Sequence, residues 1–218
     1  MTEMNEYLTR CPYLSRGFVD PPLYDTRLSP RGVEQASGLL RRKLASEHAL
    51  RPLELVICSP LSRALYTADL GLGDIQVPCI VDPDLAERHY LSSDVGRPPK
   101  ELAAEYPRFA AALETLPEQW WWRGSEAEVE AALAARLAIQ ERRELKGVSL
   151  PVEPQSSFVS RMERARDRIY ARPETRIAVV SHWGTSFSLL GGRSLKNCEL
   201  VEVQPSDLAD DIQSPPDA

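Results

Sequence analysis

The 218-residue sequence contains no long apolar run and no excess of positive charge. No stretch approaches the roughly 18 to 20 apolar residues that a bilayer-spanning helix needs, so we expect no membrane span. The net charge of −6 argues against sequence-independent nucleic-acid binding, because that binding relies on a basic surface. The N-terminal segment lacks a basic stretch followed by an apolar one, so we expect no secretory signal.

Cysteine and lysine are also scarce. The four cysteines lie far apart, with no Cys-x-x-Cys pair and no histidine at zinc-ligand spacing. We therefore expect reduced thiols in a cytoplasmic protein. The sequence implies no metal and no organic cofactor. Only four of the 26 basic residues are lysine. The others are arginine, which suits bidentate phosphate recognition, although a compositional bias accounts for most of them.

A chain of this length can bury a sizeable core but is too short for two ordinary domains and a linker. Apolar runs rich in β-branched residues predict buried strands over 53–59 and 176–181, and a weaker strand over 75–81. Helical spacing of apolar residues predicts helices over 31–47, from Ser62 onward, and over 101–116, 126–145 and 156–171.

The alternation of strands and helices predicts an α/β fold in which a mostly parallel sheet is covered on both faces, giving three layers, α/β/α. We expect a single domain over residues 1–203. Residues 204–218 are acidic and contain proline, so we expect them to form a disordered tail.

Polar residues follow both of the strongly apolar strands. Arg63 comes shortly after the first, and His182 and Gly184 come directly after the second. In a parallel sheet the carboxyl ends of the strands share one edge, where helix N-termini present free N–H groups to ligands. A guanidinium there can grip an anion, and a glycine lets the backbone approach it closely. The alternatives are a surface ion pair for the arginine and a packed, hydrogen-bonded role for the histidine.

Four segments resemble, in order, motifs of the histidine phosphatase superfamily, the phosphoglycerate-mutase-like proteins. Residues 59–68, SPLSRALYTA, resemble its Ser-Pro-x-x-Arg-Ala-x-x-Thr-Ala motif. Residues 25–36 resemble its Asp-x-x-Leu-Thr-x-x-Gly-x-x-Gln-Ala helix start. Residues 85–87 and 93–96 resemble its acid-bearing loop, and residues 180–184 its second-histidine motif. The resemblance covers nearly the whole chain and implies a phosphoglycerate-mutase-like fold.

The resemblance implies a phosphatase that hydrolyses phosphomonoesters through a phosphohistidine. A neutral histidine attacks the phosphoryl group, while arginines and a second histidine stabilise the charge on its oxygens. This implies that Arg63, Ser181, His182 and Gly184 belong to the phosphate pocket. It also implies that Glu87 protonates the leaving oxygen. The implied partner is a small phosphorylated substrate or phosphate. A mutase is less expected, because nothing identifies a site of bisphosphoglycerate size.

Glu87 has two competitors for the proton-donor role in the same part of the chain. Asp84 and Asp94 are both near enough in sequence to take it. The Leu-x-Glu context favours Glu87. Its own alternative is the ordinary fate of a glutamate, a solvated carboxylate on a loop.

One motif of the family has no clear counterpart. The resemblance implies an opening strand that ends in Arg-His-Gly and carries the nucleophilic histidine, but the three histidines, His48, His89 and His182, all follow Asp25. We expect His48 to be a structural surface residue. His89 lies on the acid-bearing loop, where contact with the substrate is one interpretation.

The nearest candidate for the opening strand is residues 6–12, EYLTRCP. In this alignment Arg10 takes the first-arginine position and Cys11 replaces the nucleophile. A thiolate can carry a phosphoryl group, and an arginine-lined pocket would lower its pKa. A pocket shaped around an imidazole nevertheless disfavours a cysteine phosphatase.

Three interpretations of the missing motif remain open. The protein is a phosphatase whose expressed form lacks the true first strand, or a degenerate member that binds a phosphorylated ligand without turnover (a pseudoenzyme), or an enzyme in which Cys11 or His182 acts with altered chemistry. A protein-interaction domain is a fourth possibility, in which the four ordered motifs would be coincidental.

The run Trp120-Trp121-Trp122 is not accounted for by the motifs. It is consistent with an aromatic substrate platform, with a partner-binding patch, or with an anchor packed onto the domain. The packed anchor is the interpretation we favour.

Overall fold

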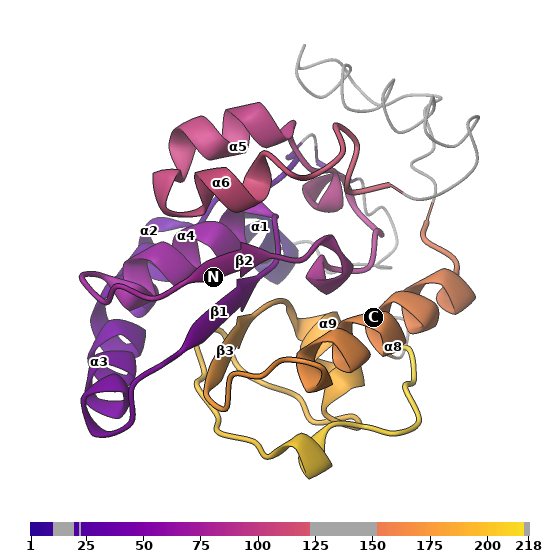
Figure 1. The fold of residues 1–218 in the computed structure, drawn as a ribbon. Coiled ribbons are helices and arrows are strands. Elements are labelled where there is room, and N and C mark those ends of the chain that lie inside the picture. Colours follow the sequence, from indigo (N-terminus) through magenta and orange to yellow (C-terminus); the bar gives the residue numbers. More distant parts are fainter. Residues whose placement is uncertain (11–19, 22, 123–151, 216–218) are drawn as a thin grey trace.

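The computed structural model describes residues 1–10, 20–21, 23–122 and 152–215 (Figure 1). Within these ranges three strands form a parallel sheet in the order β2-β1-β3. The strands are β1 (Leu55–Cys58), β2 (Cys79–Val81) and β3 (Ile177–Val180). Val56 of β1 pairs with Cys79 on one side and with Ala178 on the other. The predicted α/β fold with a parallel sheet is confirmed. The helix predicted over 126–145 lies outside the described residues.

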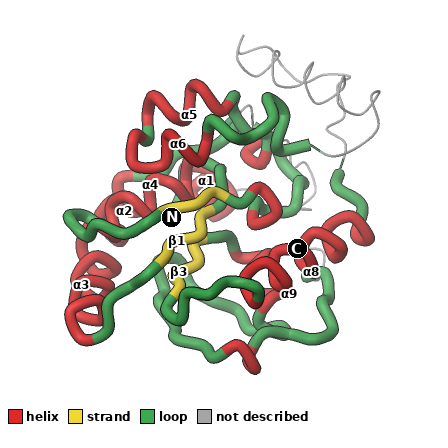
Figure 2. The backbone as a smooth tube through the Cα atoms, in the orientation of Figure 1, coloured by secondary structure: helices red, strands yellow, loops and turns green. Residues whose placement is uncertain are grey.

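Helices lie on both sides of this sheet (Figures 1 and 2). Successive side chains of a strand point to opposite faces, and the central strand β1 shows this clearly. Val56 and Cys58 pack toward α4 and its neighbours, whereas Leu55 and Ile57 pack with α8 and α9. All four residues of β1 are at most 2% exposed. The helices are α1 (Glu3–Arg10), α2 (Pro30–Gln35), α3 (Arg41–Leu50), α4 (Ser62–Leu72), α5 (Pro99–Glu105), α6 (Ala110–Leu113), α8 (Gln155–Tyr170) and α9 (Trp183–Leu189).

Two predicted helices differ from single α-helices. The helix predicted over 31–47 is present as α2 and α3, joined by the π-helical turn Ala36–Leu40, and Ser29 Oγ caps its start by accepting from Gly32 N at 3.3 Å. The helix predicted over 101–116 is broken after α5. Pro107 disfavours the α conformation of the residue before it and has no N–H to donate, so a 3₁₀ turn separates α5 from α6.

The strand predicted over 6–12 is wrong, because residues 6–10 belong to helix α1. The helix is stabilised at its start, where Asn5 N donates to Thr2 Oγ1 at 3.1 Å and Thr2 N donates to Asn5 Oδ1 at 2.9 Å. Glu3 and Glu6 in its first turn favour the positive end of the helix dipole. Arg10 is exposed at the end of α1, and Cys11 lies outside the described residues.

The disorder predicted from residue 204 is also wrong as far as residue 215. Ala209 N donates to Leu189 O at 2.9 Å. Ile212 is only 5% exposed and packs with Phe158 and Met162 of α8. Leu208 and Ala209 pack against the same cluster, so a few apolar residues anchor a segment whose overall composition is typical of disorder. In the described part of the chain, no helix has both the length and the apolar character to cross a membrane.

Candidate active site

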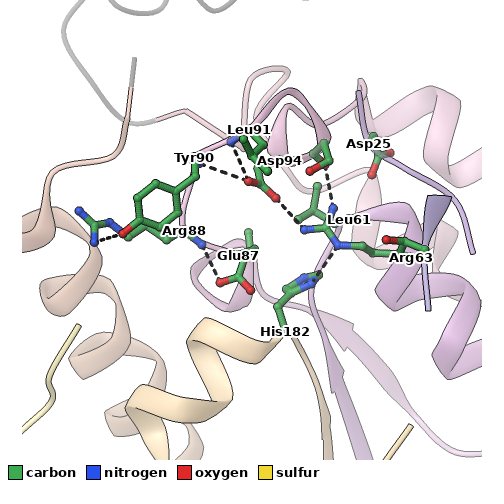
Figure 3. Close-up of polar contacts among 12 residues, drawn as sticks. Asp25, Leu61, Arg63, Glu87, Arg88, Tyr90, Leu91, Asp94 and His182 are labelled. Carbon is green, nitrogen blue, oxygen red and sulfur yellow. Dashed lines mark hydrogen bonds and ion pairs between the residues drawn. The ribbon is translucent and has the colours of Figure 1, made fainter. Parts of the chain in front are cut away.

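Arg63 and His182 meet at the carboxyl ends of two neighbouring strands. Arg63 lies in the first turn of α4, which follows β1, and His182 lies between β3 and α9. Cys58 and Val180, the last residues of the two strands, are partners in the sheet. Arg63 Nε donates to His182 Nδ1 at 3.3 Å (Figure 3). The structure therefore brings together the two residues that the strand ends were expected to place side by side.

The second ring nitrogen of His182 is also occupied. His182 Nε2 lies 2.7 Å from Ser59 Oγ, and the ring is buried. Burial, together with the positive charges of Arg63 and Arg161, holds the pKa of His182 well below its usual value. The imidazole is therefore neutral near pH 7. Because Nδ1 accepts from Arg63, the hydrogen-bond network assigns the proton to Nε2, which donates to Ser59.

The guanidinium of Arg63 is held by the acid-bearing loop as well. Its two terminal nitrogens donate to Ser93 O at 2.7 Å and to Asp94 Oδ1 at 2.8 Å. The side chains of Arg63 and Asp94 are only 12% and 6% exposed. These contacts and the one to His182 use three of the five N–H groups of a guanidinium. An incoming anion can take the remaining donors or displace Asp94.

Asp94 organises the loop rather than offering a free carboxyl group. Its second oxygen, Oδ2, accepts from Tyr90 N at 3.2 Å and from Leu91 N at 3.1 Å (Figure 3). Asp84, the other competitor for the proton-donor role, forms ion pairs with Arg164 and Arg168 of α8. Both competitors are therefore paired with arginine side chains.

Glu87 faces the start of α9. Its Oε2 accepts from Gly184 N at 3.0 Å, and its Oε1 accepts from Arg88 N at 3.0 Å. Burial, with a smaller contribution from the negative charge of Asp94, raises the pKa of Glu87, although the backbone donors and Arg63 oppose this. A Cβ at position 184 would overlap Glu87 Oε1, so only glycine allows this approach.

The other predicted site residues lie elsewhere. Ser181 Oγ pairs with Ser186 Oγ of α9 at 3.1 Å. Arg10 is exposed on α1. His48 Nδ1 accepts from Leu53 N at 3.0 Å, which fits the structural role expected for it. His89 is buried, and its ring meets that of Trp122 edge-on with 5.0 Å between centroids.

Sequence reasoning missed an internal anion at the start of α4. Asp25 accepts from Ser62 N at 2.7 Å and from Ser62 Oγ at 2.5 Å, and it pairs with Arg97 at 3.0 Å. Its side chain is fully buried, and its backbone has φ of 40°. We expected the free N–H groups at the start of α4 to donate to a ligand, but one of them, Ser62 N, donates to Asp25 instead. The motif around residue 25 was the available signal, but its link to Ser62 is a long-range contact that local patterns do not encode.

No group of three or more His, Cys, Asp or Glu side chains is placed to hold a metal ion in the described ranges. The site instead offers one guanidinium, one neutral imidazole and one carboxyl group of raised pKa, grouped at one edge of the sheet. This combination suits the binding of an oxyanion and the transfer of a proton to an atom bonded to it.

The family of the chain is shown by a sequence comparison. The sequence model of the histidine phosphatase superfamily (branch 1) matches residues 22–141, which is more than half of the chain. A curated relative, the adenosylcobalamin/alpha-ribazole phosphatase of Escherichia coli (strain K12), is 40% identical over 68 residues. That match covers 30% of this chain and 30% of the relative, so the chain matches less than a third of the relative's length.

Two solved structures resemble the fold. A candidate alpha-ribazole-5′-P phosphatase from Escherichia coli K-12 is 23% identical, with 88% of this chain and 77% of that chain covered and a TM-score of 0.47. The alpha-ribazole phosphatase from Shigella flexneri is 25% identical, with 87% and 73% covered and a TM-score of 0.45.

Proposed function

Because the chain belongs to the histidine phosphatase superfamily (branch 1), we propose that it binds the phosphoryl group of a small phosphomonoester between Arg63 and His182 and hydrolyses that ester. The observation that carries the proposal is the contact between Arg63 Nε and His182 Nδ1. The carboxyl group of Glu87 lies at the start of α9, the helix that follows His182.

Arg63 supplies the positive charge in this proposal. His182 occupies its Nε and so directs the two terminal nitrogens away from the ring. A phosphoryl group that approaches them gains charge-assisted hydrogen bonds, which are about twice as strong as neutral ones. The anion can bind to the second N–H of each terminal nitrogen, and the negative charge of Asp94, which holds one of these nitrogens, opposes its approach.

Glu87 supplies the proton. Its raised pKa increases the fraction of protonated carboxyl near neutral pH, and only that form can protonate the leaving oxygen. In the net reaction the bond between phosphorus and the alcohol oxygen breaks. The alcohol oxygen takes the proton of Glu87, water delivers hydroxide to phosphorus, and the remaining proton of water restores Glu87.

A second function is favoured by the state of His182. Both ring nitrogens are already hydrogen-bonded, to Arg63 and to Ser59, so in this arrangement the ring has no free lone pair for attack on phosphorus. A protein that binds a phosphorylated ligand without turnover would keep the same anion site and would need no nucleophile.

Release of phosphate from 4-nitrophenyl phosphate separates the two functions. The wild type is compared with Arg63→Ala and His182→Ala, and with Arg42→Ala, an exposed arginine on α3, as the matched control. Hydrolysis requires turnover in the wild type and in the control, and a loss of at least about a hundredfold in the two site variants. The binding function predicts no turnover in any of the proteins. It also predicts that phosphate raises the melting temperature of the wild type and does not raise that of Arg63→Ala. No turnover and no effect of phosphate contradicts both.

A further inference from the structure

The three consecutive tryptophans are buried, in agreement with the packed interpretation and against an exposed platform. Trp120, Trp121 and Trp122 are 2%, 8% and 7% exposed. Trp120 Nε1 donates to Arg97 O at 2.9 Å, and the rings of Trp120 and Trp121 pack edge-on with 5.7 Å between centroids. They belong to the same core cluster as residues of β1, α4 and α5.

The tryptophans also form one wall of a cavity of about 80 Å³. We call it the tryptophan cavity. A single water needs only about 10 to 15 Å³, and an apolar cavity of about 150 Å³ can hold benzene. The cavity therefore has room for a small group or for part of one planar ring. Its lining includes Glu87, His89, Trp120, Trp121, Trp122 and Arg161.

One donor at this wall lacks an acceptor. The indole N–H of Trp122 is buried and has no hydrogen-bond partner in the described part of the chain. Nearly all buried donors in folded proteins are paired with protein groups or with water, because an unpaired one is costly. Because Trp122 lines the cavity, its indole N–H is available to an acceptor that enters the cavity.

Two of the charged side chains that line the cavity, Arg161 and Glu153, neutralise each other. Arg161 donates to both carboxylate oxygens of Glu153, at 2.7 and 2.8 Å. Its remaining terminal nitrogen donates to Asp84 O at 2.6 Å and Ala86 O at 2.7 Å. A charged ligand would find no uncompensated partner in this ion pair. The lining therefore favours a neutral, flat group that packs against indole rings and accepts one hydrogen bond.

We propose that the tryptophan cavity binds part of the leaving group of the substrate, namely the edge of a neutral planar ring that carries a hydrogen-bond acceptor for Trp122. The assignment of the ring to a leaving group rests on the proposed function. Glu87 links the two places, because it lines the cavity and also accepts from Gly184 N, two residues from His182. A phosphomonoester held at Arg63 thus has its ester oxygen near Glu87 and its organic part toward the tryptophans.

The indole N–H signal of Trp122 in a ¹H–¹⁵N NMR spectrum tests this directly. The chain has four tryptophans, and Trp122→Phe identifies the signal by removing it while keeping an aromatic ring. The probe is 4-cyanophenol, which is planar, neutral at pH 6.5 and carries a nitrile acceptor. 4-Methylphenol has a similar shape and no acceptor at that position.

We expect 4-cyanophenol to shift the Trp122 signal downfield and to bind about fivefold more tightly than 4-methylphenol, a preference that Trp122→Phe abolishes. The signal of Trp183, which is exposed on α9 and donates to Ser194 Oγ, is the internal control and stays in place. Unchanged signals of the other three tryptophans show that the variant is folded.

The binding result is independent of catalysis. A Trp122 signal that does not move at millimolar probe, or one that moves no more than that of Trp183, overturns the cavity proposal even if the protein hydrolyses phosphomonoesters. A specific shift without hydrolysis of 4-nitrophenyl phosphate supports the cavity as a ring-binding site and contradicts only the hydrolytic function. If hydrolysis is present, Trp122→Phe should lower kcat/KM for 4-cyanophenyl phosphate about fivefold more than it lowers kcat/KM for glycerol 2-phosphate, which carries no ring.

Discussion

At the scale of single residues, the site is a small hydrogen-bonded network in which each polar group fixes the position of its neighbour. The neutral imidazole of His182 fixes one nitrogen of Arg63, and Asp94 holds another. Glu87 is kept apart from this pair by its two backbone donors. The consequence is that anion binding, proton donation and fold stability respond to different titrations and substitutions.

Asp94→Asn should strengthen the binding of inorganic phosphate. The amide keeps an oxygen that can accept from the loop backbone, but it removes the negative charge that competes for Arg63. We expect the Kd for phosphate, measured by thermal shift, to fall by about three- to tenfold. Weaker binding in this variant would mean that the loop geometry set by Asp94 matters more than its charge.

The pH dependence of turnover should report Glu87. The group must be protonated to act as the acid, so kcat falls as pH rises through its raised pKa. In Glu87→Gln this alkaline limb should vanish and the maximal rate should drop by at least about a hundredfold. An unchanged alkaline limb in the Glu87→Gln profile would assign the proton to another group.

The free energy of unfolding at acid pH should depend on the protonation of His182. Its pKa in the folded protein lies below the ordinary value of 6.5, so below that pH the unfolded chain binds more protons than the folded one. The free energy of unfolding of the wild type should therefore fall as pH drops from about 6.5. That of His182→Gln should fall less steeply over the same pH range. Urea titrations at several pH values measure the two slopes. Equal slopes would show that the ring is not held neutral.

At the scale of elements, the sequence predicted those helices and strands that short-range interactions determine. The apolar run of β1, the helix after it and α8 were all predicted, because hydrophobic periodicity and caps act over a few residues. The order of the strands was not predicted. Among the described strands β3 lies at an edge of the sheet, and its Val179 is 39% exposed although this strand was predicted to be buried. Sheet order depends on long-range pairing, as does the contact of Asp25 with α4. The strand predicted at residues 6–12 was drawn from motif order, whereas the Thr2 and Asn5 cap favours a helix.

Removing the charge of Asp25 should destabilise the start of α4. Asp25→Asn leaves Arg97 buried beside a weaker partner and weakens the acceptor for Ser62, so we expect a loss of about 3 kcal/mol in the free energy of unfolding. Asp74→Asn, which changes an exposed carboxylate paired with Arg41, is the matched control and should have little effect. Urea unfolding measures both. A small effect of Asp25→Asn would mean that Ser62 and Arg97 find other partners.

At the scale of the whole molecule, helices lie on both sides of the sheet (Figure 1). The site forms at the carboxyl ends of β1 and β3. The family match over residues 22–141 includes three of the four motif segments, and the fourth, residues 180–184, lies beyond it. The segment from 204 to 215 was misjudged because composition does not record that Ile212 enters the core beside α8.

The packing of that segment should be measurable. Ile212→Ala should lower the free energy of unfolding by about 2 kcal/mol, because it opens a cavity beside Phe158 and Met162. Leu50→Ala, at a position that is 76% exposed at the end of α3, is the control and should cost much less. If both variants unfold at the same urea concentration as the wild type, the segment contributes nothing to the core.

The account depends most on whether the guanidinium at position 63 and the imidazole at position 182 form a site for an oxyanion. Calorimetric titration with orthovanadate, comparing the wild type with Arg63→Ala and with Arg42→Ala, measures this without requiring turnover. We expect saturable binding in the wild type and in Arg42→Ala, and at least a tenfold weaker affinity in Arg63→Ala. Equal affinity in all three proteins, or binding in none, would contradict it.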